Sequence, residues 1–313
     1  MYKKNRIGII IPAHNEQDFI IKTIQGLPSY IDEYIVIDDG STDQTSQRVK
    51  AMALKNKKIV LLKNTRNCGL GYTVKRGFLY FIEHKSVDIV CITAADNQFE
   101  GRYLTPMIEN IINNKCDYAK SNRFLDQYSL NKMPTHRLFG NIVFTLLTKL
   151  ASGYYTIFDT LNAFSATKLS TIQKMNMREL KNRFDFEISY LMQHAYLNAR
   201  VKDFFTPVKY DTEISDVNYI TFIFQALSVL TLGFLRRINR KYVMYNFHPI
   251  ALFFYSGGIM LFFGIAMGVY ITFHSFGPRP ATTATVMLSV VPFILGIQFI
   301  LQAIVLDIQN EPR

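Results

Sequence analysis

The stretch that decides the fold is Ile7–Asp43 (IGIIIPAHNEQDFIIKTIQGLPSYIDEYIVIDDGSTD). Ile7–Ile11 is a β-branched run that predicts a strand ending at Pro12, and a helical segment follows from about residue 15 to Leu27. Tyr34–Ile37 predicts a second strand. A strand, a helix and a second strand in succession indicate a βαβ unit of a parallel sheet.

The same alternation continues through the next fifty residues. We expect a helix over 44–55, started by Thr42 or Asp43 as its cap, and a strand over 58–63. A glycine-bearing turn at Asn67–Gly71 leads into a helix to about Glu83, and Asp88–Thr93 predicts a fourth strand. The N-terminal part is therefore expected to be an α/β domain with a doubly wound, mostly parallel sheet.

The composition indicates a mixture of a soluble part and a membrane part. The chain has 313 residues, of which 49% are hydrophobic and only 19% charged, with a net charge of +11. A disordered chain would be poorer in apolar residues. The three cysteines include no CxxC spacing, which argues against a disulfide framework or a thiolate zinc site and for a reducing compartment.

The last third of the chain contains two long stretches without Asp, Glu, Lys or Arg, Tyr242–Pro278 and Pro280–Leu306. A bilayer core needs about 20 apolar residues of helix, so we expect transmembrane helices over 249–273 and 285–306, joined by a turn at 274–280. Two buried core helices are the alternative. Such helices rarely run this long without a charge.

The uncharged run Val217–Leu235 has a different pattern, because Thr221, Gln225 and Ser228 fall into one polar stripe. We expect an amphipathic helix at the membrane surface, with Phe222, Ile223, Leu227 and Leu230 entering the acyl boundary. The basic residues that follow are expected among anionic lipid phosphates on the cytoplasmic side. They are Arg236, Arg237, Arg240 and Lys241.

These features predict three regions: a cytoplasmic catalytic domain over 1–216, a juxtamembrane segment over 217–244, and a transmembrane hairpin with a short tail over 245–313. The apolar run near the N-terminus is too short for a signal peptide. Both termini are therefore expected in the cytoplasm of a multi-pass membrane protein.

Polar clusters follow three of the predicted strands, at Pro12–Glu16, Asp38–Asp43 and Asp96–Gln98. In doubly wound sheets, ligands bind beyond the carboxyl ends of the strands. One such cluster is ordinary loop chemistry, whereas three on one edge indicate a single site.

Four motifs in order resemble the family 2 glycosyltransferases, and within them the polyprenyl-phosphate (dolichyl- or undecaprenyl-phosphate) glycosyltransferases. They are Ile11-Pro-Ala-His-Asn-Glu16, Val36-Ile-Asp-Asp-Gly-Ser-Thr-Asp43, Asn67-Cys-Gly-Leu-Gly71 and Ala94-Ala-Asp-Asn-Gln98. The resemblance covers residues 6–215. It implies a GT-A nucleotide-sugar-binding fold, a nucleotide-sugar donor, a divalent cation and an inverting transfer.

By the same resemblance, a set of residues is expected to bind the donor. These residues are Pro12, His14, Glu16, Ile37, Asp39, Asn67, Ala94, Ala95, Asp96, Gln98 and Arg123. A first-turn helix charge is the alternative for Glu16, and a plain turn is the alternative for the segment around Asn67.

The metal motif of the family, Asp-x-Asp followed by Gln, is incomplete because Ala94 replaces the first Asp. Asp96 and Gln98 remain as the implied ligands of Mg²⁺ or Mn²⁺. Water and phosphate can fill the rest of an octahedral shell, so sparse protein ligation is compatible with a metal.

The middle of the chain supplies the remaining implied catalytic residues beside Asp96. Arg123 matches an arginine that touches the donor diphosphate, and Arg137 lies in a stretch near the acceptor. A solvated charge at a helix start is the alternative for Arg137. Asp159 matches the family's Asp before a Gly-Phe pair. The family's basic donor loop has no arginine in Lys209–Ser215, so no donor contact is expected there.

The resulting expectation is transfer of a sugar from a UDP- or GDP-linked donor to a polyprenyl phosphate, making a lipid-linked sugar. A degenerate nucleotide-sugar-binding scaffold and a transferase with another lipid or glycan acceptor stay open. A processive polysaccharide synthase is disfavoured because the chain has no Trp. Nucleic acid is not an expected partner, since the basic residues show no aromatic-interleaved pattern. The sugar, the nucleotide and a homo-oligomeric state are left open.

Overall fold

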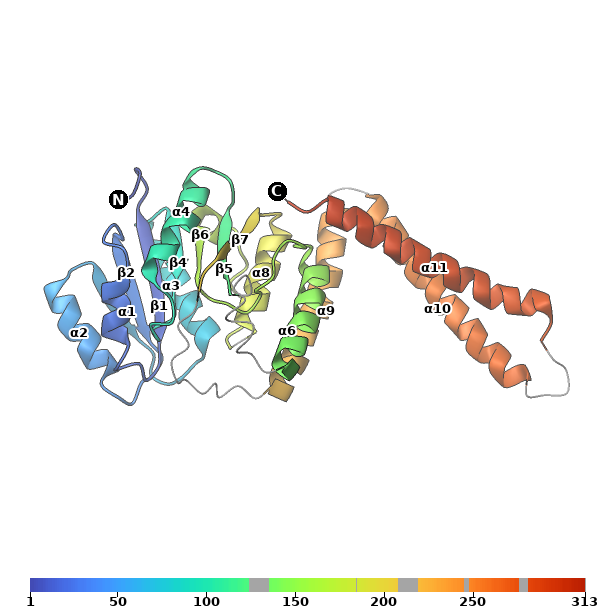
Figure 1. The fold of residues 1–313 in the computed structure, drawn as a ribbon, viewed down its shortest axis with the longest axis horizontal. Coiled ribbons are helices and arrows are strands. Elements are labelled where there is room, and N and C mark those ends of the chain that lie inside the picture. Colours follow the sequence, from blue (N-terminus) through green and yellow to red (C-terminus); the bar gives the residue numbers. More distant parts are fainter. Residues whose placement is uncertain (124–134, 184, 208–218, 245–247, 276–280, 313) are drawn as a thin grey trace. The chain divides into compact units, whose positions relative to one another are not determined.

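The computed structural model describes residues 1–123, 135–183, 185–207, 219–244, 248–275 and 281–312, without the side chains of 135–141, 219–225 and 275. Figure 1 shows its elements in chain order. They are β1 (Ile7–Ala13), α1 (Ile20–Gly26), β2 (Glu33–Asp38), α2 (Thr45–Lys55), β3 (Ile59–Lys63), α3 (Leu70–His84), β4 (Ile89–Ile92), the 3₁₀ turn η1 (Gly101–Tyr103), α4 (Leu104–Ile112), β5 (Tyr118–Asn122), α6 (Thr135–Ser152), β6 (Ser165–Lys168), α7 (Leu169–Ile172), α8 (Phe186–Tyr196), β7 (Val201–Phe205), α9 (Tyr219–Ile238), the π-helical segment η2 (Asn239–Met244), α10 (Pro249–Ser275) and α11 (Thr283–Gln309).

Among the described residues, the strands form one seven-stranded sheet in the order β3-β2-β1-β4-β6-β5-β7. β1 is parallel to β2 and β4, β3 is parallel to β2, and β7 is parallel to β5. β6 alone runs antiparallel to its neighbours, β4 and β5. All strands except β6 therefore end at the same edge, which we call the carboxyl edge, and β6 begins there. The expected doubly wound, mostly parallel sheet is confirmed.

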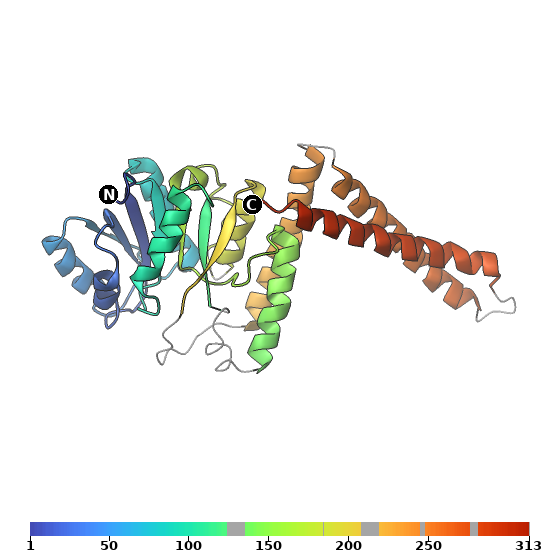
Figure 2. The ribbon, with the colours of Figure 1, turned by 45° about the horizontal axis from the view of Figure 1, so that its top comes forward.

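The two faces of the sheet carry separate cores of buried side chains. Figures 1 and 2 show helices on either side of the strands. Ile7, Ile9 and Ile11 of β1 pack with residues of α1, α2 and α4, whereas Ile10 packs with residues of α3, α7 and α8. A strand that is buried on both faces reads as an uninterrupted apolar run, because alternate side chains enter different cores. The apolar run that predicted β1 has this origin.

The first expected helix begins later than the sequence indicated, at Ile20 instead of about residue 15. The intervening residues bond to the loop after β2 instead of forming a first helical turn. The second helix begins at Thr45 with Gln44 at its N-cap and no side-chain cap hydrogen bond, so the expectation that Thr42 or Asp43 caps it is wrong. Asp43, one residue before the cap, accepts a hydrogen bond from the Thr45 amide at 2.9 Å.

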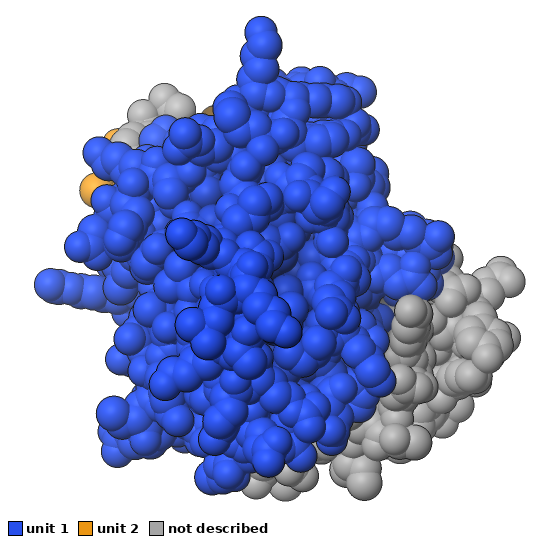
Figure 3. All heavy atoms as spheres, turned by 90° about the vertical axis from the view of Figure 1, so that its left-hand side faces the viewer, with its two compact units in different colours: residues 1–233, 312–313 blue, residues 234–311 orange. Residues whose placement is uncertain are grey.

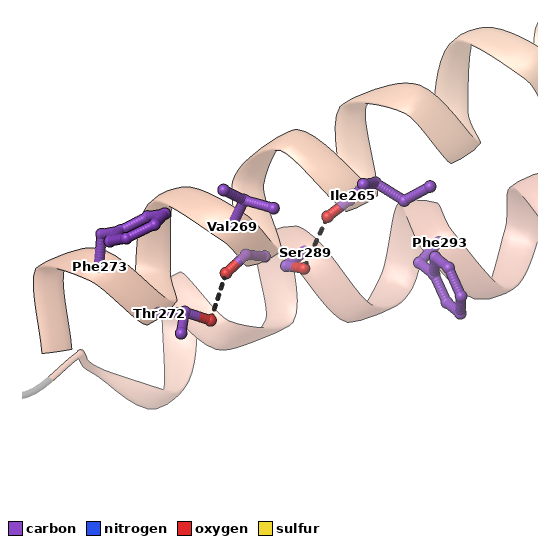
Figure 4. A pocket seen from close by; sticks show the side chains of 8 residues that line it. Ile265, Val269, Thr272, Phe273, Ser289 and Phe293 are labelled. Atoms are coloured by element: carbon purple, nitrogen blue, oxygen red, sulfur yellow. Dashed lines mark hydrogen bonds between the residues drawn. The ribbon is translucent and has the colours of Figure 1, made fainter.

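The C-terminal hairpin consists of two helices long and apolar enough to cross a membrane, Pro249–His274 and Thr283–Gln309. They pack closely: a Cβ added to Gly264 would lie 2.7 Å from the backbone nitrogen of Phe293. In Figure 4, the Ser289 hydroxyl donates a hydrogen bond across the pair to the Gly264 carbonyl, at 2.8 Å. Small residues at such contacts let helix backbones approach in lipid. The two expected apolar helices are confirmed.

A buried ion pair ties the residues before the hairpin to its last turn. Arg237 Nη1 and Nη2 donate to the two carboxylate oxygens of Asp307 at 2.8 and 2.7 Å, and the Tyr242 hydroxyl donates to Asp307 at 2.5 Å. Arg237 is 1% exposed. The expectation that Arg237 lies among lipid phosphates is therefore wrong, because its guanidinium is enclosed and bonded to Asp307. Because Asp307 lies 70 residues from Arg237 in the sequence, the ion pair could not be predicted from the local sequence pattern.

The chain divides into two compact units, residues 1–233 with 312–313 and residues 234–311. In Figure 3, the described atoms in view belong almost wholly to the first unit. α9 begins in the first unit, where Leu227 is 38% exposed but Leu230 is only 4% exposed. Leu230 therefore packs inside the protein instead of facing lipid. The side chains of Phe222 and Ile223 lie outside the described residues.

Candidate active site at the carboxyl edge

The loop after β1 is bonded to the loop after β2, so two of the predicted polar clusters form one wall. His14 Nδ1 lies 2.9 Å from the Asp39 carbonyl oxygen, and the Glu16 amide donates to Thr45 Oγ1 at 2.8 Å. Asn15, between them, has φ +58°, a left-handed conformation that asparagine tolerates. The sharp turn at Asn15 brings the two loops together.

Asp38 shapes the turn after β2. Its buried carboxylate accepts hydrogen bonds from the Ser41 amide at 2.8 Å and from the Ser46 hydroxyl. Burial alone would raise the pKa of Asp38, but the bonds from Ser41 and Ser46 outweigh it and the pKa lies below its ordinary value. Asp38 is thus an ionised turn-forming residue.

Asp39 organises the glycine turn before α3. Its Oδ1 accepts from Asn64 Nδ2 at 2.6 Å and from the Cys68 amide at 2.9 Å, and its Oδ2 accepts from the Gly69 amide at 2.8 Å. Gly69 has φ +95°, and a Cβ there would lie 2.6 Å from the Asn182 carbonyl oxygen, so only glycine fits. The expected donor residues Asp39 and Asn67 are thereby brought together in one corner.

Asp96 and Gln98 lie directly beyond β4 at the same edge. The Gln98 amide donates to Asp96 Oδ1 at 3.0 Å, which curls the loop around the carboxylate. The Ala95 carbonyl accepts a hydrogen bond from Thr23 Oγ1 at 2.8 Å, which attaches this loop to α1. Asp96 is therefore held in a fixed turn next to the end of β1.

The residues at Asp96 fit a cation that arrives with a phosphate ligand. Within the described ranges, no group of three or more His, Cys, Asp or Glu gathers as a ready-made metal cluster. Asp96 offers carboxylate oxygen and Gln98 an amide oxygen, which are ligands that Mg²⁺ and Mn²⁺ accept. Since Mg²⁺ is commonly held by one or two carboxylates plus substrate phosphates, this donor set suits a cation shared with a diphosphate.

Pro12 and Ile37 are register partners at the ends of β1 and β2, and both are buried. Their positions near the ends of the two strands place both at the carboxyl edge. Ala94 is half-buried at the start of the Asp96 loop.

Arg123, directly after β5, forms an ion pair with Asp159, which lies between α6 and β6. Arg123 Nε and Nη2 donate to the two oxygens of Asp159 at 2.6 and 3.0 Å, and the Arg123 amide donates to Oδ2 at 3.1 Å. Burial would raise the pKa of Asp159, but the charge and hydrogen bonds of Arg123 hold it below its ordinary value. The Asp159 side chain is 1% exposed and that of Arg123 is 27% exposed, so the arginine alone reaches the surface.

Two other expectations fall on parts that the structure leaves undescribed. The side chain of Arg137, at the start of α6, is not described, and neither is the segment Lys209–Ser215.

Residues 8–185, more than half of the chain, match the pattern of the family described as "Glycosyl transferase family 2". The chain belongs to glycosyl transferase family 2. It is therefore a glycosyltransferase, and its carboxyl edge is the region of the sheet where such a site was expected.

Relatives of this glycosyltransferase include two enzymes named for lipid phosphates. It is 28% identical over 183 residues to the UDP-N-acetylglucosamine–dolichyl-phosphate N-acetylglucosaminyltransferase of Methanococcus voltae, covering 54% of this chain and 72% of that one. It is 22% identical over 199 residues to the undecaprenyl-phosphate mannosyltransferase of Micrococcus luteus, covering 63% and 80%.

A solved structure shares the fold of the glycosyltransferase. Glucosyl-3-phosphoglycerate synthase from Mycobacterium tuberculosis, crystallised with Mn²⁺, UDP-glucose and phosphoglyceric acid, superposes with a TM-score of 0.56 at 16% identity. The match covers 74% of this chain and 80% of that one. The expected GT-A fold is confirmed.

Sequence reasoning missed a buried charged layer beneath the Arg123–Asp159 pair. Lys120, 1% exposed, lies 3.6 Å from Glu187, and its register partner on β7 is Asp203. Asp203 Oδ2 accepts from the Phe158 amide at 2.8 Å, and burial raises the pKa of Asp203 to about 7. Opposite charges on neighbouring strands can predict such a buried layer only when the strand order is known. The sequence pattern did not predict β5 or β7, so this pairing could not be anticipated.

Proposed function

We propose that this glycosyltransferase transfers a single sugar from a UDP- or GDP-linked donor to a polyprenyl phosphate, with inversion at the sugar C1. The observation that carries the proposal is the combination, in one chain, of a family 2 carboxyl edge and two helices apolar enough to span a membrane. The names of the Methanococcus and Micrococcus relatives support a lipid phosphate as the acceptor.

The donor would lie across the carboxyl edge. The corner of His14, Asp39 and the Asn67 turn would receive the nucleoside, because its backbone is already ordered by the Asp39 carboxylate. Asp96, with Gln98, would hold a Mg²⁺ or Mn²⁺ ion against the diphosphate. When bound, such an ion stabilises the negative charge that builds on the departing nucleoside diphosphate.

Arg123 is suited to the donor diphosphate because its guanidinium is aligned and partly exposed. A planar guanidinium donates two parallel hydrogen bonds to phosphate oxygens, and alignment before binding lowers the entropic cost of forming them. Asp159 would fix that alignment from the buried side. Arg137 would face the acceptor phosphate.

The acceptor chemistry explains how the transfer works without a dedicated base. A phosphate monoester has a second pKa of about 6, so at pH 7 the acceptor is largely a dianion. One phosphate oxygen forms the new bond to C1 as the bond from C1 to the donor diphosphate breaks, and the nucleoside diphosphate leaves with that electron pair. A hydroxyl acceptor would instead have to lose a proton to a general base.

The location that suits this reaction is the cytoplasmic face of a membrane. The Arg237–Asp307 pair supports a hairpin whose two ends lie on one side, because it joins the segment before α10 to the end of α11. The catalytic domain and the C-terminal tail would then share the cytoplasmic side.

The proposal is tested with the full chain in nanodiscs containing undecaprenyl phosphate or dolichyl phosphate. A panel of radiolabelled UDP- and GDP-sugars is offered with Mg²⁺ or Mn²⁺, and the organic-soluble product is counted. We expect a labelled lipid with one donor, lost in Asp96→Ala and on addition of EDTA. Release of free sugar without a labelled lipid from every donor would refute the lipid acceptor.

A further inference from the structure

The described part of α6 exposes apolar side chains and buries polar ones, the reverse of the usual pattern of a surface helix. Its outward side chains are large and apolar: Ile142 is 58% exposed, Val143 40%, Leu146 57% and Leu147 36%. We call these four residues the α6 outer face. A helix on the surface of a soluble domain carries its apolar stripe toward the core and its polar side chains toward water. α6 therefore presents to its surroundings the side that is usually buried.

The inner side of α6 is small and polar. Thr148, Ala151 and Ser152 are buried. Thr148 Oγ1 donates to the Phe144 carbonyl at 2.9 Å, and Ser152 Oγ donates to the Thr148 carbonyl at 2.7 Å. Because the helix satisfies these hydroxyls itself, its inner side packs against α8 without an unsatisfied polar group. The inverted pattern is thus compatible with a stably folded helix.

An exposed aromatic residue and a lysine adjoin the α6 outer face. Phe158 is 50% exposed, and its carbonyl accepts a hydrogen bond from Thr145 Oγ1 at 3.1 Å. Lys149 Nζ lies 3.5 Å from the centre of the Phe158 ring. An aromatic ring beside a long cationic side chain suits the boundary between acyl chains and headgroups, where the ring enters the apolar layer and the ammonium stays near phosphates.

A second helix on the same support also exposes apolar side chains. Gly233 of α9 lies against Met192 of α8, and a Cβ at Gly233 would come within 2.9 Å of the Met192 side chain. In the same part of α9, Leu227 is 38% exposed and Leu232 63% exposed. α6 and α9 thus both rest on α8 and both carry exposed leucines.

We propose that the α6 outer face, with Phe158, is a membrane-docking surface of the catalytic unit, in addition to the anchoring hairpin. The occupant is the lipid bilayer, because the chain carries two helices apolar enough to span one and its net charge of +11 favours an anionic surface. Contiguous exposed apolar surface of this kind marks a membrane or protein interaction site. This inference rests on the part of the proposed function that places the protein in a membrane, and it does not require that the proposed sugar transfer be correct.

The depth of α6 is measured in the full chain by fluorescence quenching. Single cysteines at Leu146→Cys and, as a matched control, at the 87% exposed Leu54→Cys of α2 are introduced in a Cys68→Ser background and labelled with an environment-sensitive dye. The other two native cysteines are buried. Leu54 is a suitable control because α2 packs on β3, at the opposite end of the sheet from β7.

In nanodiscs of phosphatidylglycerol and phosphatidylcholine with brominated acyl chains, we expect the dye at position 146 to be quenched several-fold more than the dye at position 54. Equal, weak quenching at both positions would overturn the proposal. Cross-linking of position 146 between two copies, with no quenching by brominated lipid, would assign the α6 outer face to a protein interface and would also overturn it.

A second variant tests the consequence for the acceptor. Ile142→Asn with Leu146→Asn removes apolar surface without touching the carboxyl edge, so the KM for lipid acceptor should rise several-fold with an unchanged KM for the nucleotide sugar. The matched control is Leu79→Asn, which alters a residue 51% exposed on α3. A rise of both KM values together, or an equal effect of the control, would contradict docking. The quenching result stands whether or not the proposed acceptor is right.

Discussion

Asp159 holds the guanidinium of Arg123 by a two-point ion pair, with Nε at 2.6 Å from Oδ2 and Nη2 at 3.0 Å from Oδ1. The carboxylate is enclosed by protein and the arginine is partly exposed. The pair therefore acts in one direction: a buried group fixes the orientation of a group at the surface. Charge-assisted pairs of this geometry are among the stronger hydrogen bonds in proteins.

Arg123→Lys should lower kcat/KM for the nucleotide sugar by about 10- to 100-fold, because lysine keeps the charge but loses the planar two-point contact. The measurement is steady-state transfer with varied donor. Arg102→Lys is the control, since Arg102 is 71% exposed, pairs with Glu100 and is not among the expected donor or catalytic residues. Equal activity of both variants would show that the geometry of Arg123 is irrelevant.

Asp39→Asn should lower the free energy of unfolding by about 1–3 kcal/mol, because an amide has one acceptor oxygen for three donors and leaves a buried donor unsatisfied. Those donors are Asn64 Nδ2 and the amides of Cys68 and Gly69. Thermal unfolding followed by circular dichroism measures the change. Asp18→Asn, at an exposed residue, should stay within about 0.5 kcal/mol of wild type. Unchanged stability of Asp39→Asn would refute the loop-ordering role.

The fold and the site could be anticipated to different extents. The strands β1 to β4 lie within one residue or so of their expected starts, because each is a short apolar run. Of these, β1, β2 and β4 are buried on both faces of the sheet. β5 contains Lys120, Ser121 and Asn122, and all five of its residues are buried. A strand of that composition reads as a loop, since the buried side chains of Lys120 and Asn122 are bonded to partners distant in sequence. The expected donor residues lie at the carboxyl edge, but their roles remain predictions.

Asp203 gives the folded protein a pH dependence near neutrality. Its pKa rises from 3.8 to about 7 through burial, so the unfolded chain releases this proton at lower pH than the folded protein does. The stability contributed by the protonated carboxyl is complete below about pH 4 and is lost as the pH rises toward 7.

Asp203→Asn cannot titrate and should therefore gain stability relative to wild type between pH 4 and pH 8, by on the order of 1–3 kcal/mol. The Phe158 amide keeps its acceptor in this variant, since asparagine retains one oxygen. Melting curves of both proteins across this pH range provide the comparison. Parallel curves, with a constant difference at all pH values, would mean that the Asp203 carboxyl does not titrate there.

Asp307→Asn should destabilise the hairpin unit by about 3–5 kcal/mol, because it leaves the buried Arg237 without a counter-charge. The double variant Arg237→Met with Asp307→Leu should recover most of that loss, since apolar side chains of similar size replace both charges. Thermal denaturation in detergent micelles distinguishes the three proteins. A double variant as unstable as the single one would show that the ion pair itself, and not the unpaired charge, determines stability.

The central claim is that the carboxyl edge transfers one sugar to a lipid phosphate. The most direct test compares two acceptors, undecaprenyl phosphate and undecaprenol. Each is offered to the full chain in nanodiscs with the active nucleotide sugar and Mg²⁺ or Mn²⁺, and the lipid product is identified by mass spectrometry. The account predicts a product from the phosphate alone, heavier by one sugar residue, with one nucleoside diphosphate released per product and none formed by Asp96→Ala. Glycosylation of undecaprenol, addition of several sugars, or transfer that persists in Asp96→Ala would contradict it.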